Sequence, residues 1–202
     1  MRRAPLDAFA LAIALAVIVT GIGSITDPAP ASASSEEPRF VLTVFPHETD
    51  TVGFSNSWGA PRSGGRGHRG TDIMSPRGTE IVAVADGVIT KLGESRLSGY
   101  FIRIEHGNGW ATSYMHLNND TLGTDDGEGG VWTAFYATIL EGDEVRAGQV
   151  IGYVGDSGNA EGTRPHTHFE VRHDGKKMNP YHFLRDVLDR EQRFPNSTDQ
   201  PI

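Results

Sequence analysis

Apolar and polar residues alternate along most of the chain after Phe40, in short runs that glycines interrupt. The runs are rich in β-branched and aromatic residues and have strand-like lengths, which predicts β-strands. In order, they are FVLTVF, EIVAVADGVITKL, YFIRIEHG, WATSYMHL, QVIGYVG and HTHFEVRHDG. The glycines between them supply turns and bulges. The pattern therefore predicts a mainly β fold, an antiparallel β-sheet domain.

A helical pattern occurs near the C-terminal end, in NPYHFLRDVLDREQRF at residues 179–194. Pro180 stands near the expected helix start, a position that proline favours. Apolar residues recur there at helical spacing and would share one face; they are Phe183, Leu184, Val187 and Leu188. We expect one short C-terminal helix to close the domain, with a tail at residues 195–202.

Residues 118–130, NNDTLGTDDGEGG, differ from the rest because they are polar, acidic and rich in glycine. This composition predicts a long surface loop. The acidic residues Asp120, Asp125, Asp126 and Glu128 do not have the spacing of oxygen ligands that a calcium loop requires. We interpret them as solvated charges on the loop.

The first 33 residues have the features of an export signal. Arg2 and Arg3 provide a positive start, AFALAIALAVIV is an unbroken apolar run, and ASA at residues 31–33 precedes the expected cleavage point. A retained membrane anchor is the alternative, although the strongly apolar part of about 12 residues is shorter than the roughly 20 that span a bilayer. No cysteine follows the run, which excludes a lipid-anchored lipoprotein. Either interpretation places the working domain outside the cytoplasm, in the cell envelope or secreted.

The composition, with 37% hydrophobic and 8% aromatic residues among 202, suits one globular domain, which we place at residues 40–194 after a flexible lead at 34–39. The formal net charge is −8, and signal cleavage would remove two charges of each sign. Such a chain has no electrostatic attraction for nucleic acid or, once cleaved, for an anionic membrane. Without cysteine, its stability outside the cell must come from its core or from a metal. The sequence does not indicate an oligomeric state.

Two short motifs contain candidate metal ligands. GHRGTDI places His68 and Asp72 four residues apart, with Gly70 between them so that the chain can bend. PHTHFEV places His166 and His168 two residues apart in an expected strand, so that both rings would project from one face. Imidazole nitrogens and a carboxylate oxygen are suitable ligands for zinc.

A third motif, ATSYMHL, would by the same alternation put Tyr114 and His116 on one face of a strand. Each motif alone has an ordinary interpretation as an exposed pair or a hydrogen-bonded histidine, and only the paired His-x-His is costly to bury without a partner. Their occurrence together in one exported, cysteine-free β domain favours a shared site. The other histidines are interpreted as surface, turn or packing residues: His47, His106, His173 and His182.

The motifs GHRGTDI, YMHL and GDSGNAEGTRPHTHFEV, in this order, resemble the lysostaphin-type zinc metallopeptidases, which are bacterial cell-wall endopeptidases. The stretches SPRGTEIVAVADGVI and GDEVRAGQVIGYVGDSG extend the resemblance, which covers roughly Ser57 to Pro180. It implies an open substrate groove on the sheet and hydrolysis of peptide bonds in peptidoglycan, in cross-links or stem peptides, by a zinc-activated water.

Carried over residue by residue, the resemblance implies one Zn²⁺ per chain held by His68, Asp72 and His168. His116 and His166 would be the catalytic, non-ligand histidines. Three protein ligands leave one position for water, whose pKa zinc lowers to about 7. The chain has no His-Glu-x-x-His motif to supply a glutamate base, so a histidine must move the proton.

The chain departs from the family pattern in two places. APRSGGRG lacks the tyrosine with which some members hold the substrate carbonyl, which leaves Tyr114 or Arg62 as candidates. The acidic loop and VWTAFYATIL are inserted after His116, where they would border or partly cover the groove. The alternative function is a non-catalytic envelope binding module or hydrolase activator on the same fold. Such members typically lose a ligand, whereas all five expected residues are present here.

Overall fold

The computed structural model describes residues 39–47 and 53–193, all within one unit of the chain, Pro38–Ile202. The expected export signal, nearly all of the expected lead and the tail at 195–202 lie outside the described residues. Among the residues described, no helix is both long and apolar enough to cross a membrane.

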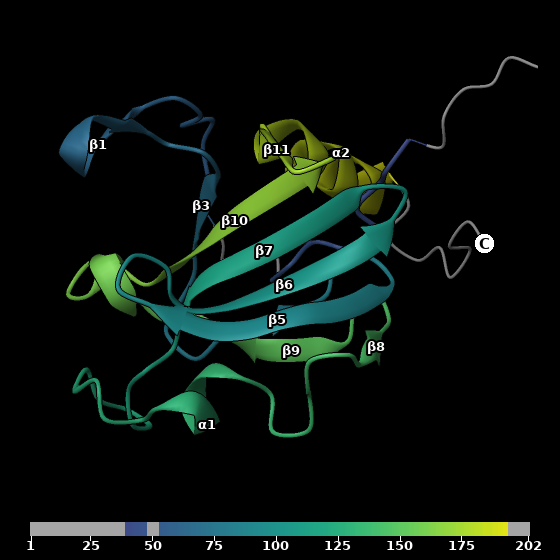
Figure 1. Cartoon of the computed structure of the whole chain (residues 1–202). Coiled ribbons are helices and arrows are strands. Elements are labelled where there is room, and N and C mark those ends of the chain that lie inside the picture. The colour runs from purple at the N-terminus through teal and green to yellow at the C-terminus, as the bar shows by residue number, and fades with distance from the viewer. Residues whose placement is uncertain (1–38, 48–52, 194–202) are drawn as a thin grey trace, which may run out of the picture. The chain divides into compact units, whose positions relative to one another are not determined.

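The main sheet is antiparallel and has seven strands (Figure 1). Six of them lie in the spatial order β11 (Lys176–Met178), β10 (His166–His173), β7 (Trp110–Leu117), β6 (Gly99–Gly107), β5 (Gly87–Ser95) and β8 (Glu144–Val145). The seventh, β3 (Thr71–Met74), pairs with the first half of β10, and β11 pairs with the second half. The prediction of a mainly antiparallel β domain is confirmed.

The remaining elements are short, apart from one helix. Two small sheets pair β1 (Pro61–Arg62) with β2 (Arg66–Gly67), and β4 (Glu80–Val82) with β9 (Val150–Tyr153). The 3₁₀ turns are η2 (Ser63–Gly65) and η3 (Gly158–Ala160), and the α-helices are α1 (Val131–Ala134) and α2 (Pro180–Arg193). The long helix α2 agrees closely with the predicted helix at 179–194, whereas α1 lies in the segment after the acidic loop, where no helix was expected.

The core lies against one face of the sheet. On β10 this face carries Thr167, Phe169 and Val171, which are fully buried. From α2, Leu184 and Val187 join the same apolar cluster, as do Ile81 of β4 and Ile151 of β9. The helix and the small β4–β9 sheet therefore cover the core face of the main sheet, while the opposite face of β10 carries His166, His168 and Glu170.

Candidate metal centre and its surroundings

The pairing of β3 with β10 places two predicted ligands side by side. His168 lies directly opposite Asp72 in this antiparallel ladder. Residues opposite each other in such a ladder project from the same face, close enough for their side chains to touch. The distance between His168 Nδ1 and Asp72 Oδ1 is 2.9 Å. The contact is therefore a direct consequence of strand register.

His68 reaches the same point from the loop that precedes β3. Its Nε2 lies 3.0 Å from Asp72 Oδ1 and 3.0 Å from His168 Nδ1. The approach depends on Gly70, because a Cβ at that position would lie 2.5 Å from His168 Nε2 and 2.7 Å from the Phe169 carbonyl oxygen. Three potential metal-ligand atoms, two nitrogens and one oxygen, thus converge within hydrogen-bonding distance of one another.

The second nitrogen of each of these rings faces an acceptor. His68 Nδ1 lies 3.2 Å from the Ser57 carbonyl oxygen and 2.9 Å from the Ser57 hydroxyl, and His168 Nε2 lies 3.4 Å from Glu170 Oε1. If each of these nitrogens carries the proton, His68 Nε2 and His168 Nδ1 turn their lone pairs toward the Asp72 oxygen. Ligating histidines in metal sites show this arrangement, with the outer N–H donated to a carbonyl or carboxylate.

The charge at this point also fits a cation. Burial by itself raises the pKa of Asp72, but hydrogen bonds and charge interactions with His168 and His68 outweigh it and hold that pKa well below its ordinary value. Glu170 behaves in the same way: burial raises its pKa, and contacts with His168 and Lys177 bring it down to about 2. Both carboxylates are therefore ionised at neutral pH, and the converging lone pairs form a site that suits a divalent metal.

The family comparison covers this site entirely. The sequence model of peptidase family M23 matches residues 66–180, more than half of the chain. The chain belongs to peptidase family M23. The family assignment confirms the resemblance to lysostaphin-type peptidases.

Individual M23 proteins show how far the similarity extends. The DD-carboxypeptidase/endopeptidase Mpg of Neisseria meningitidis serogroup B is 40% identical over 113 residues, 56% of this chain and 22% of Mpg. The murein hydrolase activator NlpD of Salmonella dublin is 33% identical over 163 residues, 80% of this chain and 36% of NlpD. The catalytic domain of lysostaphin from Staphylococcus simulans superposes with a TM-score of 0.52 at 27% identity, covering 66% of this chain and 92% of that domain. The matches span about a fifth to a third of the curated relatives' own length.

Two further histidines of the M23 domain lie beside the three donors. The ring centroids of His116 and His166 are 5.2 Å apart, and that of His116 is 6.0 Å from that of His168. His116 Nδ1 lies 2.9 Å from the Ser157 carbonyl oxygen, and His166 Nδ1 lies 2.8 Å from the Arg164 carbonyl oxygen. Because a carbonyl oxygen only accepts hydrogen bonds, each Nδ1 carries the ring proton and donates the hydrogen bond. In each neutral ring, Nε2 therefore has a lone pair that can accept a proton.

His116 reaches this face through a β-bulge. In the β6–β7 ladder the pairing passes from Met115 directly to Leu117, so His116 is the extra residue, and its φ is +62°. A bulge shifts the alternation of side chains and commonly re-aims a residue next to an active site. A non-glycine residue with positive φ is strained and is retained where the surroundings hold it. The backbone N–H of His116 donates to the Ser98 carbonyl at 2.8 Å, which fixes the bulge.

The bulge corrects the expectation that Tyr114 and His116 share a face. Tyr114 lies opposite Phe169 on the core face, is fully buried, and accepts a hydrogen bond from the Val84 N–H at 3.0 Å. It is therefore not available to hold a substrate carbonyl. Arg62 of β1 does lie at the centre, where its guanidinium donates to Asp72 Oδ2, and its side chain is 43% exposed.

Ser157 holds His116 in place, a role that the sequence alone did not reveal. Its hydroxyl donates to the Leu117 carbonyl at 2.5 Å and accepts from the Tyr100 N–H at 3.0 Å. Gly99 packs directly on Ser157, and a Cβ at Gly99 would lie 2.1 Å from that hydroxyl oxygen. Ser157 is part of the GDSG stretch that carried the family resemblance, so the motif was visible although the contact was not.

Asp120 of the acidic loop is not a solvated charge, contrary to expectation. It is fully buried, as is Asp156, and both form ion pairs with Arg77. Asp125 joins them at 2.8 Å from Arg77 and is exposed. We name these four residues the Arg77 cluster. Its carboxylates lie close enough together to suit a metal ion, but the guanidinium already supplies the cation. The exposed residues Asp126 and Glu128 agree with the prediction.

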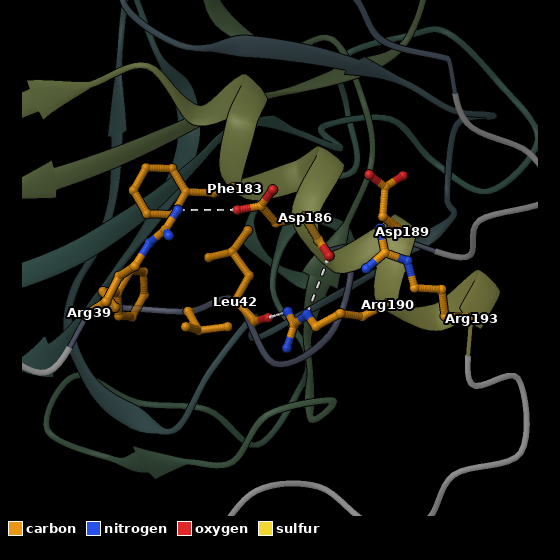
Figure 2. Close-up of a pocket in the computed structure, with 9 residues that line it drawn as sticks. Arg39, Leu42, Phe183, Asp186, Asp189, Arg190 and Arg193 are labelled. Atoms are coloured by element: carbon orange, nitrogen blue, oxygen red, sulfur yellow. Dashed lines mark hydrogen bonds and ion pairs between the residues drawn. The ribbon is translucent and has the colours of Figure 1, made fainter.

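A cavity of about 280 Å³ lies elsewhere, between the start of the described chain and α2 (Figure 2). Arg39 crosses it to pair with Asp186 at 3.3 Å, and Arg190 donates to the Leu42 carbonyl. None of the five candidate site residues lines this cavity. The candidate metal centre is therefore separate from this cavity.

Proposed function

We propose that the chain is an exported zinc endopeptidase that hydrolyses peptide bonds in bacterial peptidoglycan. The observation that carries the proposal is the convergence of His68 Nε2, Asp72 Oδ1 and His168 Nδ1. The donor set is the one that zinc takes in catalytic sites, where three protein ligands leave a position open. We assign these three residues as the ligands of one zinc ion.

The catalytic roles fall to His116 and His166. Bound zinc would supply an acidified water and polarise the scissile carbonyl. Burial lowers the pKa of His116 to about 4, partly offset by its hydrogen bond to the Ser157 carbonyl, so the ring is neutral at pH 7 and can accept the water's proton. The two imidazoles together can then deliver a proton to the leaving amine, while their Nδ1–H bonds keep both rings oriented.

Glu170 and Arg62 support the ligands in this assignment. Glu170, held by Lys177 and Arg172, accepts from His168 Nε2 and so fixes the orientation of that ligand. Arg62 engages the Asp72 oxygen that faces away from the two imidazoles. Its partly exposed guanidinium has further N–H groups to offer a substrate carbonyl.

The substrate class and location rest on the relatives. Mpg is named as a DD-carboxypeptidase/endopeptidase and NlpD as a murein hydrolase activator, and murein is peptidoglycan. We therefore assign the chain to the cell envelope or the secreted fraction, with residues 1–33 as a cleaved export signal. The net charge of −8 agrees with a substrate that is neither nucleic acid nor anionic lipid.

The second candidate is a non-catalytic activator of another hydrolase. The similarity to NlpD covers 80% of this chain, whereas that to Mpg covers 56%. Against it stands the complete set of three donors and two adjacent histidines. His116 is also kept beside the three donors in a strained conformation, with its ring held by the Ser157 carbonyl.

The test is to incubate the purified, zinc-loaded protein with purified peptidoglycan and identify the released fragments by mass spectrometry. We expect new amine termini, which identify the bond that is cut. They should disappear with a chelator and in His116→Ala but persist in His182→Ala. His182 is exposed and lies outside the site, so its variant controls for histidine loss. Intact peptidoglycan with stoichiometric zinc bound would contradict the peptidase assignment and favour the activator.

A further inference from the structure

Apolar side chains are exposed on one segment of the domain to an unusual degree. We name residues 118–140, the acidic loop and the segment after it, the insertion. Five of the nine large apolar side chains exposed among the described residues belong to it: Leu122, Val131, Trp132, Tyr136 and Leu140. The three most exposed of the nine are Leu122 at 100%, Trp132 at 79% and Leu140 at 67%. Single exposed apolar residues are ordinary, but such a concentration marks an interaction surface.

The insertion presents these side chains from a fixed backbone. Between the exposed positions, Ala134 is fully buried and Ile139 is 6% exposed. Phe135 forms a bridge with Gly152, and the Tyr136 N–H donates to the Ile151 carbonyl of β9 at 3.1 Å. The insertion therefore buries one side against the domain, and Trp132, Tyr136 and Leu140 project from the other. We name the five exposed side chains the insertion surface.

The base of the insertion is also anchored. Asp120 and Asp125 pair with Arg77, which in turn pairs with Asp156. Asn119 donates to Glu161 at 3.0 Å. A surface that is already ordered loses little conformational entropy when a partner docks.

The charged residues within and just after the insertion are all acidic, although Arg77 from another segment pairs with Asp120 and Asp125, and Lys91 pairs with Glu141. Between His116 and Arg146 the chain carries seven acidic residues and no basic one: Asp120, Asp125, Asp126, Glu128, Glu141, Asp143 and Glu144. Asp126, Glu128, Glu141 and Glu144 are exposed. A second copy of this segment or an anionic lipid surface would bring like charges together, which is unfavourable. The complementary partner is apolar and positively charged.

We propose that the insertion surface is a docking site for a basic, amphipathic segment of another polypeptide. Apolar side chains of the partner would pack on Trp132, Tyr136 and Leu140, and its lysines or arginines would face the surrounding carboxylates. The site is separate from the candidate metal centre, and the proposal does not depend on peptide hydrolysis.

The test measures binding of a labelled amphipathic peptide of leucine and lysine to the full-length protein by fluorescence anisotropy. Trp132→Ser with Leu140→Ser is expected to weaken binding about 10-fold or more, because central aromatic anchors dominate such contacts. The matched control, Val41→Ser with Leu97→Ser, removes two exposed apolar side chains outside the insertion and should leave binding unchanged. Glu128→Gln with Glu144→Gln should weaken binding and reduce its dependence on salt.

Three comparison probes can overturn the proposal. They are a leucine–glutamate peptide of the same design, phosphatidylglycerol vesicles and an N-acetylglucosamine hexamer. Tighter binding of any of them than of the leucine–lysine peptide assigns the surface to another class of partner. Equal binding of the leucine–lysine peptide to both double variants contradicts the docking site. Self-association that is lost in Trp132→Ser with Leu140→Ser assigns the surface to a second copy. Circular dichroism and zinc content establish that each variant is folded.

Discussion

The candidate metal centre and the insertion differ in how they are built. At the metal centre, strand register and a bulge place polar side chains on one face, and hydrogen bonds hold each of the five rings and carboxylates in place. In the insertion, a cluster of buried charges holds the backbone while large apolar side chains remain in water. The first arrangement serves chemistry, which needs fixed atoms, and the second serves association, which needs uncovered area.

The largest expected effect is loss of the metal centre in Asp72→Ala. This variant removes the oxygen that both His68 and His168 contact. We expect zinc to be lost and fragment release to fall by a factor of roughly 10³ or more, since a metal contributes several kcal/mol to the transition state. Zinc per chain and fragment release are measured beside Glu144→Ala, an exposed acid. Full zinc content in Asp72→Ala would contradict the ligand assignment.

His116 separates catalysis from metal binding. We expect His116→Ala to keep zinc and to lose activity by about 10² to 10⁴-fold, the range for a general acid–base group. His116→Asn removes the imidazole while suiting the positive φ, because asparagine adopts the left-handed region readily. We expect the asparagine variant to be equally inactive but more stable in urea than the alanine variant. Activity in either variant near that of the native protein would show that His116 only supports the fold.

The Arg77 cluster tests how the insertion is held. Arg77→Met leaves Asp120 and Asp156 buried without their cation, and removal of one partner of a buried pair typically costs about 3–5 kcal/mol. Equilibrium unfolding in urea measures this loss. Arg77→Met combined with Asp120→Asn and Asp156→Asn should recover most of it. A loss below about 1 kcal/mol in the single variant would show that water replaces the guanidinium.

Glu170→Gln tests the support of a ligand rather than the ligand itself. The glutamine amide oxygen can still face His168 Nε2–H, but it lacks the negative charge of the carboxylate. Loss of such outer contacts typically lowers metal affinity about 10 to 100-fold. Competition with a chelator measures the affinity, and Glu105→Gln, at an exposed position of β6, is the control. Unchanged zinc affinity with an unchanged pH profile would leave Glu170 with a purely structural role beside Lys177 and Arg172.

The smallest effect concerns His47, which lies on the core side of β10. His47 Nε2 contacts the Thr167 hydroxyl at 3.0 Å, and burial lowers the pKa of His47 to about 3. The unfolded chain, with an ordinary pKa near 6.5, binds the proton first, so stability is lost as the pH falls below that value. We expect roughly 1.5 kcal/mol of the free energy of unfolding to be lost between pH 6.5 and 5. Urea unfolding of His47→Gln should show a flatter pH dependence, and an equal slope would contradict the assignment.

The sequence predicted the parts of the fold that follow from local periodicity. The alternation in PHTHFEV correctly put His166 and His168 on one face of β10, and the apolar spacing after Pro180 correctly indicated α2. The structure also brings together His68, Asp72 and His168, which the family resemblance had grouped. Motifs at glycine turns and strand ends carry such information because they constrain the backbone locally.

The failures occurred where a distant partner or a bulge overrides the local pattern. Strict alternation put His116 on the face of Tyr114, and only pairing with β6 creates the bulge that turns it away. The spacing of acids in the loop gave no sign that Asp120 is buried, because Arg77 and Asp156 come from separate segments. No signal in the sequence indicated that the main-chain oxygen of Ser157 accepts a hydrogen bond from His116 Nδ1–H.

The position of β10 has a consequence for how long the metal centre persists. β10 is paired along both edges, with β7 on one side and with β3 and then β11 on the other. Its amides can exchange with solvent deuterium only when two ladders open together, so they should be among the slowest in the domain. The insertion adds no strand to the main sheet, and its residues 121–128 are all exposed. A protease in the surroundings of the protein would therefore cut the insertion first, and the severed domain would keep its ligands in place.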